Sequence, residues 1–141
     1  MDRRTFLATV GSGTLVLTTG CSAVLEKPGP FDFGIINWRQ RAYAAEVVLR
    51  KNDGEKLVDG RFDIAANGPD REDPPGIYLR DVTRVRNGDT VDARVVLDGE
   101  TFRGSYEVTC NRTDGFGNDF FLRIYSGEPS EIDFSGSECG G

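Results

Sequence analysis

Hydrophobic and polar residues alternate with a period of two along most of the chain, and short polar segments interrupt this alternation. One face of the segment 42–51, for example, would carry Tyr43, Ala45, Val47 and Leu49. This period is that of a half-buried β-strand, and no comparable stretch has the helical period of 3.6. The pattern predicts strands at residues 33–38, 42–51, 55–66, 77–82, 90–98, 100–110, 119–127 and 131–135.

Turn residues separate several of the predicted strands. Asn52, Asp53 and Gly54 predict a tight turn in which the glycine takes the positive φ, and Asp98 with Gly99 predicts a two-residue hairpin turn. Strands that recur about every 8–12 residues are typical of two packed sheets. We therefore expect an all-β fold, an antiparallel β-sandwich of about 7–8 strands, that occupies residues 32–141 as a single domain.

The first 20 residues have a different pattern. Arg3 and Arg4 precede an uncharged run from Phe6 to Gly20. Fifteen helical residues would extend about 22 Å, short of the roughly 30 Å hydrocarbon core of a bilayer. A core helix would need a polar face, and the run offers only Thr and Ser for it. The order of basic start, apolar run and small residues predicts a signal peptide at residues 1–20.

The segment "DRRTFL" resembles the twin-arginine export signal, which implies that Arg3, Arg4, Phe6 and Leu7 are read by an export receptor. The route implied by this resemblance carries proteins that are already folded. A membrane-anchored protein at the extracytoplasmic face is then expected.

The segment "TTGC" that ends at Cys21 resembles a lipobox, which implies that Cys21 becomes the lipidated first residue of the mature protein. Gly20 fits this pattern, whereas Thr18 replaces the usual leucine. Cleavage nearby without lipid, and a disulfide at Cys21, remain as alternatives. Residues 21–31 are expected to form a flexible tether that Pro28 and Pro30 keep extended.

The remaining sequence resembles a diffuse group of haloarchaeal surface lipoproteins. The resemblance lies in "NW" at residues 37–38, in the segment "LDGETFRGSYEVTC" and in a closing "I-x-F-S" strand followed by a final cysteine. It implies an immunoglobulin-like sandwich, and it supplies no catalytic residue.

The composition is acidic and arginine-rich. The chain has 17 Lys plus Arg against 23 Asp plus Glu, and from Cys21 onward the counts are 15 against 22, a net charge of −7. Such a surface repels phosphate backbones, so nucleic acid is not an expected partner. Only three basic residues are lysines, against 14 arginines. This balance is typical of proteins from salt-loving archaea, although a GC-rich genome also favours arginine codons.

The chain contains no histidine, which removes the usual general base, the usual metal ligand and every histidine-containing triad. We expect no catalytic residue, no metal and no cofactor. The acidic loops 68–73 and 111–119 carry oxygen ligands suited to calcium, but solvated turns are the preferred interpretation because neither has the spacing of a helix-flanked calcium loop.

Cys110 and Cys139 are the two cysteines left after Cys21, and in an exported protein they predict a disulfide. Asn111, Arg112 and Thr113 form a glycosylation sequon, so Asn111 is a candidate acceptor on a loop.

Three large aromatic residues at strand spacing are assigned to the core, with a carbohydrate-stacking platform as the alternative: Trp38, Phe102 and Tyr106. The features together predict a non-catalytic module at the cell surface, held to the membrane by a lipid anchor, with envelope proteins or glycans as possible partners. The alternatives are a solute- or glycan-binding lipoprotein and a hydrolase that works with carboxylates alone.

Overall fold

A computed structural model describes residues 26–69, 72–112, 117–127 and 131–139. The residues predicted to serve export and lipidation, Arg3, Arg4, Phe6, Leu7 and Cys21, lie outside these ranges. Eight strands are present in this part: β1 Gly29–Asn37, β2 Tyr43–Lys51, β3 Glu55–Ile64, β4 Gly76–Val85, β5 Thr90–Leu97, β6 Glu100–Glu107, β7 Asn118–Ile124 and β8 Ile132–Gly136. Within the described residues, no helix is long and apolar enough to cross a membrane.

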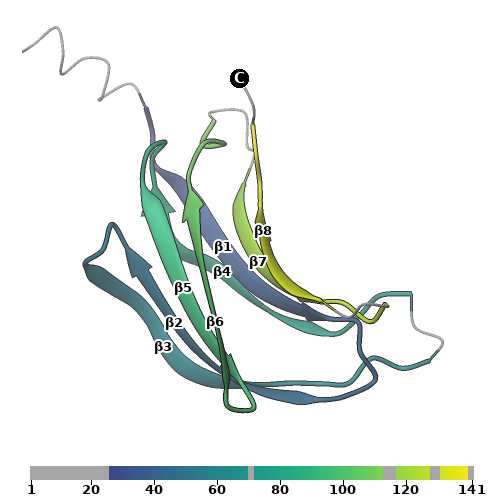
Figure 1. The fold of residues 1–141 in the computed structure, drawn as a ribbon. Coiled ribbons are helices and arrows are strands. Elements are labelled where there is room, and N and C mark those ends of the chain that lie inside the picture. The colour runs from purple at the N-terminus through teal and green to yellow at the C-terminus, as the bar shows by residue number, and fades with distance from the viewer. Residues whose placement is uncertain (1–25, 70–71, 113–116, 128–130, 140–141) are drawn as a thin grey trace, which may run out of the picture.

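The strands form two four-stranded sheets, in the orders β4-β1-β7-β8 and β3-β2-β5-β6, packed face to face (Figure 1). The predicted all-β sandwich is confirmed. One pairing differs from a fully antiparallel arrangement, because β1 and β7 run parallel. The chain also passes from one sheet to the other directly after β1, whereas the constant-type immunoglobulin order keeps its first two strands in one sheet.

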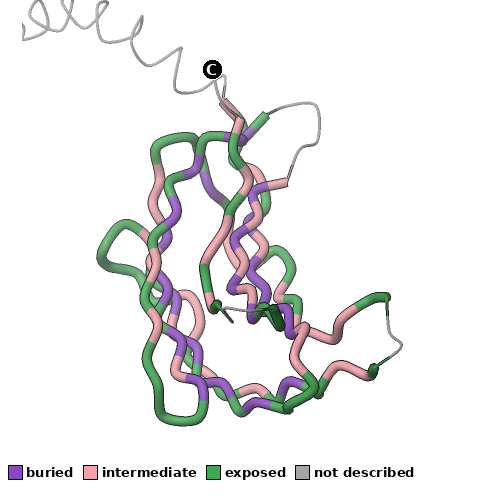
Figure 2. Tube along the Cα trace, turned by 45° about the vertical axis from the view of Figure 1, so that its right-hand side comes forward, coloured by how far each residue is buried: buried purple, intermediate pink, exposed green. Residues whose placement is uncertain are grey.

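The period-two alternation produces the core. In β5, Val91, Ala93, Val95 and Leu97 are buried. Figure 2 shows buried and more exposed residues alternating along the strands in the same way. The buried side chains of both sheets meet in one hydrophobic cluster that includes Phe33, Leu49 and Leu122. Removing this apolar surface from water is the main contribution to stability.

The sandwich begins earlier than expected. β1 starts at Gly29, and Phe31 is fully buried. Residues 29–31, which were expected to be part of a flexible tether, therefore belong to the packed sandwich. The apolar side chains of residues 31–36 continue the strand alternation, and the two prolines do not interrupt it. Pro30 lies at the start of β1, where a strand tolerates proline.

The predicted turns are present, with one change in backbone detail. In the hairpin between β5 and β6, Asp98 and Gly99 both have positive φ, at 48° and 93°. In the turn between β2 and β3, the positive φ falls on Asn52 and Asp53, at 51° and 58°, rather than on Gly54. Asn and Asp tolerate this region better than other non-glycine residues, which explains why the glycine is not needed for it.

The predicted disulfide between Cys110 and Cys139 is formed, with its Cα atoms 5.1 Å apart. Cys110 follows β6 and Cys139 follows β8, so the bond connects the ends of two edge strands that belong to different sheets.

Candidate functional sites

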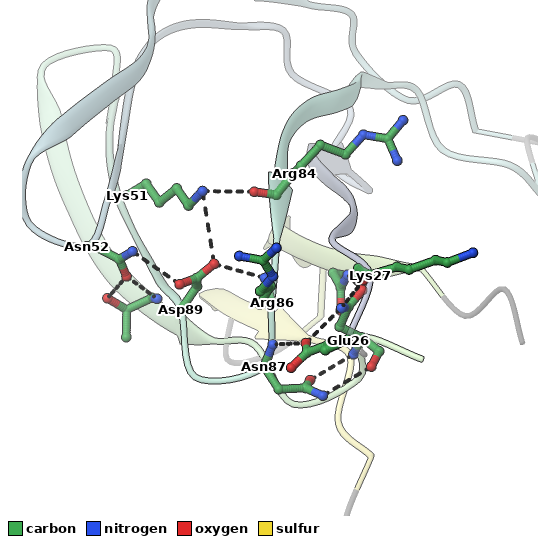
Figure 3. Close-up of polar contacts among 11 residues, drawn as sticks. Glu26, Lys27, Lys51, Asn52, Arg84, Arg86, Asn87 and Asp89 are labelled. Atoms are coloured by element: carbon green, nitrogen blue, oxygen red, sulfur yellow. Dashed lines mark hydrogen bonds and ion pairs between the residues drawn. The ribbon is translucent and has the colours of Figure 1, made fainter. Parts of the chain in front are cut away.

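The first described residues are fastened to the sandwich by a polar network at one end of the molecule (Figure 3). Glu26 Oε2 accepts hydrogen bonds from the backbone N–H of Asn87 at 2.6 Å and from Asn111 Nδ2 at 2.9 Å. The same Asn111 Nδ2 donates to the carbonyl of Lys27 at 2.8 Å. The hydrogen bonds from Asn111 and Asn87 lower the pKa of Glu26, which remains charged at neutral pH.

A second carboxylate, Asp89, connects the β4–β5 turn to the β2–β3 turn at the same end (Figure 3). Its oxygens accept from the N–H of Arg86 at 2.8 Å and from Asn52 Nδ2 at 3.2 Å. Lys51 Nζ lies 4.0 Å from Asp89 and donates to the carbonyl of Arg84 at 2.8 Å. Burial raises the pKa of Asp89, but the two hydrogen bonds and Lys51 outweigh it and hold the pKa below its ordinary value.

The placement of Asn111 differs from the solvated loop expected for a glycosylation acceptor. The residue is only 6% exposed, and its Nδ2, the atom that would carry a glycan, donates to both Glu26 and Lys27. In the folded chain this nitrogen is therefore not available for the attachment of a glycan. The sequence contains the sequon, but it does not show the tertiary contacts of Asn111.

The outer face of the β4-β1-β7-β8 sheet carries a row of aromatic rings around Arg123. The Arg123 guanidinium lies 5.8 Å from the ring centre of Trp38 and 5.5 Å from that of Phe121, and its Nε donates to Ser135 Oγ at 2.7 Å. Trp38 also stacks on Tyr125 with ring centres 5.5 Å apart.

This row corrects part of the aromatic assignment. Tyr106 is buried and Phe102 packs against the core, as predicted, but Trp38 belongs to the outer face. The sheet alternation places residue 38 on the side opposite Asn37. Trp38 therefore packs against Tyr125 and Arg123 in this row rather than in the core.

The outer face of the β3-β2-β5-β6 sheet holds an open hollow of about 530 Å³. The side chains that line it are Val48, Arg50, Asp92, Arg94, Arg103 and Ser105. Ala93 and Gly104 also line it, and because the Ala93 side chain is buried on the inner side, backbone forms the floor at this point. None of the residues that line this hollow stood out in the sequence, because single arginines on a polar strand face are common.

A smaller hollow of about 420 Å³ lies at the end of the sandwich opposite Glu26, beyond the last residues of β1 and β7. Asn67 lines it together with Trp38 and Ser126. Its Nδ2 donates to the carbonyl of Trp38 at 3.3 Å, and its Oδ1 is buried without a hydrogen-bond partner among the described residues. This oxygen could accept a hydrogen bond from a small polar group.

Two carboxylates lie on neighbouring strands, since Asp32 in β1 is paired with Asp119 in β7. Burial raises the pKa of Asp119, and the charge of Asp32 raises it further. However, Asp32 Oδ1 already accepts from the backbone N–H of Asp81 at 2.7 Å. Among the described residues, no three His, Cys, Asp or Glu side chains gather as a metal site would require, and both acidic loops extend beyond those residues.

The fold and the bond between Cys110 and Cys139 define a disulfide-linked, two-sheet β-sandwich. No protein-family model matches the chain, and no curated protein matches it.

Proposed function

We propose that the chain is an exported lipoprotein whose sandwich acts as a non-catalytic interaction module at the extracytoplasmic face of the membrane. The observation that carries the proposal is the attachment of Glu26 to Asn87 and Asn111, only five residues after Cys21 in the sequence. A disulfide favours an oxidising compartment, which agrees with export. The similarity to haloarchaeal surface lipoproteins and to the twin-arginine signal points in the same direction.

With a lipid on Cys21, this attachment would also limit how the module faces the membrane. Five residues span at most about 18 Å when extended, so a lipid on Cys21 keeps the end that contains Asn87 and Asn111 close to the bilayer. The opposite end, with Trp38 and Asn67, would then point away from the membrane. The module would be presented in one general orientation rather than on a long linker.

The non-catalytic assignment rests on the carboxylates of two places, the β1–β7 pair and the larger hollow. Asp32 is engaged by the backbone of Asp81, and Asp92 is the single carboxylate in the larger hollow. The hydrolase alternative requires two carboxylates placed around one scissile bond. Binding without chemistry is the better supported proposal.

Cell fractionation tests export and anchoring. We expect the wild-type chain in the membrane fraction and outside the cytoplasm, Cys21→Ser exported but released, and the Arg3→Lys/Arg4→Lys variant retained inside the cell. A matched control, Arg61→Lys/Arg80→Lys, keeps the charge and changes two arginines of the body, so it should behave as wild type. Full release of the wild type, or normal export of the twin-lysine variant, would contradict the proposal.

A further inference from the structure

We propose that the hollow lined by Arg50, Arg94 and Arg103 binds an oxyanion group of the phosphate or sulfate type. The proposal concerns a site on one outer sheet face, and it deepens the proposed interaction role by naming the chemistry of the ligand.

The register places two arginines directly opposite each other. Arg94 of β5 pairs with Arg103 of β6, and their neighbours Ala93 and Val95 are buried, so Arg94 points to the outer side. Both arginines are exposed. Like charges at directly opposed positions of an antiparallel pair destabilise it.

No internal partner relieves this repulsion in the part of the chain that the structure describes. Arg94 and Arg103 take part in none of the side-chain hydrogen bonds or ion pairs found there. Asp92 is opposite Arg50 in the β2–β5 pairing, yet the two side chains form no ion pair. Arg50 instead donates to the carbonyl of Gly54 at 3.3 Å.

The hollow therefore carries three positive side chains against one negative one, in a chain with a net charge of −7 from Cys21 onward. This local reversal of sign attracts an anion and disfavours a cation. A guanidinium fork matches the oxygen geometry of phosphate and sulfate groups and donates two hydrogen bonds to them. A bound anion would also remove the repulsion between Arg94 and Arg103.

The shape suits a small charged group. A volume of about 530 Å³ lies within the range of small-ligand sites, and the backbone floor at Ala93 and Gly104 lets a ligand approach the sheet closely. Ser105 contributes a hydroxyl to the lining, and Val48 contributes an apolar side chain. Arg50 lies one residue before Lys51, which donates to the carbonyl of Arg84 at the end of the molecule that contains Glu26. In the proposed orientation this end lies close to the membrane. The ligand could therefore be either a free anion or a lipid headgroup.

The test uses the purified full chain with Cys21→Ser, which has no acylation site, in sodium chloride at constant ionic strength. Titration calorimetry with sodium phosphate and sodium sulfate should give saturable binding. Arg94→Gln and Arg103→Gln should each weaken it about 10- to 100-fold, since each removes a charge-assisted contact. Arg80→Gln, which removes the same charge from the outer face of the other sheet, should leave it unchanged.

Vesicles distinguish the two sources of the ligand. Sedimentation with phosphatidylglycerol vesicles, with phosphatidylcholine vesicles as the control, and release by added phosphate would identify a lipid headgroup. Binding of phosphate without binding of vesicles would identify a free ion. Either result supports the site.

Two results would overturn the proposal: no saturable binding of either ion or of the anionic vesicles, or an Arg80→Gln variant weakened as much as Arg94→Gln. Unfolding midpoints show whether each variant is folded, and Arg94→Gln should be at least as stable as its parent because it removes the repulsion. These measurements are made in solution and do not depend on export, so this proposal and the anchoring proposal can fail separately.

Discussion

The two outer faces of the sandwich use the same residue type in opposite ways. On the β4-β1-β7-β8 sheet, Arg123 lies beside Trp38 and Phe121 and donates to Ser135, so its charge is satisfied within the protein. On the β3-β2-β5-β6 sheet, Arg94 and Arg103 oppose each other and have no such partner among the described residues. Strand alternation directs all three side chains outward, but only the neighbouring strands decide whether an arginine packs or is free to bind.

The difference also has an energetic consequence. Cation–π contacts contribute about 0.5–1 kcal/mol each at exposed sites, whereas an opposed like-charge pair has the reverse sign. One sheet face is therefore stabilised by its arginine, and the other gains from losing one.

Removal of the disulfide should have the largest effect on stability. The Cys110→Ala/Cys139→Ala variant should lose about 3 kcal/mol in its free energy of unfolding, because a bond that closes a loop of this length restricts the unfolded chain. Denaturant unfolding measures the change, and reducing agent added to wild type serves as a control with the same expected shift. A loss below about 1 kcal/mol would contradict the role of this bond. Oxyanion binding should persist in the variant, since its arginines lie within β2, β5 and β6.

A methyl group at Gly34 should disturb the packing of the β4-β1-β7-β8 sheet. A Cβ at this position would lie 2.7 Å from Phe121 Cε1 and 2.9 Å from the carbonyl oxygen of Ile77. Gly34→Ala should therefore cost about 1–3 kcal/mol through overpacking. Gly54→Ala is the control, because its nearest neighbour would be the Asn52 carbonyl oxygen at 3.8 Å. Equal unfolding midpoints for the two variants would show that Phe121 is free to move away.

Two matched substitutions test the contrast directly. Arg123→Gln should lower the free energy of unfolding by about 1 kcal/mol, since it removes two ring contacts and the hydrogen bond to Ser135. Arg94→Gln should raise it by a few tenths of a kcal/mol. Both values come from denaturant unfolding in the same buffer without phosphate or sulfate. Changes of the same sign would contradict the proposed difference between the faces.

Acid should lower the stability of the folded chain through the end of the molecule that contains Glu26 and Asp89. The pKa values of Glu26 and Asp89 are lowered in the folded chain. Their stabilisation is therefore present above the ordinary carboxylate pKa of about 4 and is lost as the pH falls through the lowered values. The raised pKa of Asp119 acts in the opposite direction.

The acid effect should be a few tenths of a kcal/mol, because both carboxyls lie at the surface. Unfolding measured from pH 6 down to pH 2 tests it. Asp89→Asn should flatten the profile in this range, while Asp119→Asn should make the loss on acidification steeper. An unchanged profile for Asp89→Asn would mean that its hydrogen bonds do not favour the charged form.

Local patterns predicted the strands because strand alternation and turn chemistry are short-range properties. All eight predicted strands have a counterpart, and the Asp98–Gly99 hairpin has the expected positive φ angles. Boundaries shifted where tertiary contacts extend a strand: Gly29 pairs with Val85 of β4, and pairing with β7 begins at Phe31. The parallel pairing of β1 with β7 was not predicted, since the two segments are far apart in the chain.

The candidate sites depended on contacts that the linear pattern does not contain. Asn111 has the sequence of a glycosylation acceptor, and only the fold brings Glu26 and Lys27 to its amide nitrogen. The Arg94–Arg103 pair could have been found from the predicted hairpin, because the Asp98–Gly99 turn determines which residues face each other. The lack of an ion pair to Arg94 or Arg103 among the described residues could be seen only from the positions of the neighbouring strands.

The sequence by itself determined the class of fold, the main hairpin turns and the acidic composition, because these follow from alternation, turn residues and charge. It favoured the Cys110–Cys139 disulfide but left a bond at Cys21 open. The tertiary structure alone decided which polar groups are already satisfied. Pairing between distant strands places Arg123 among aromatic rings and leaves Arg94 and Arg103 facing solvent together. The energy of a charged side chain depends on what lies within a few ångströms of it, and in a sandwich most of those neighbours come from other strands.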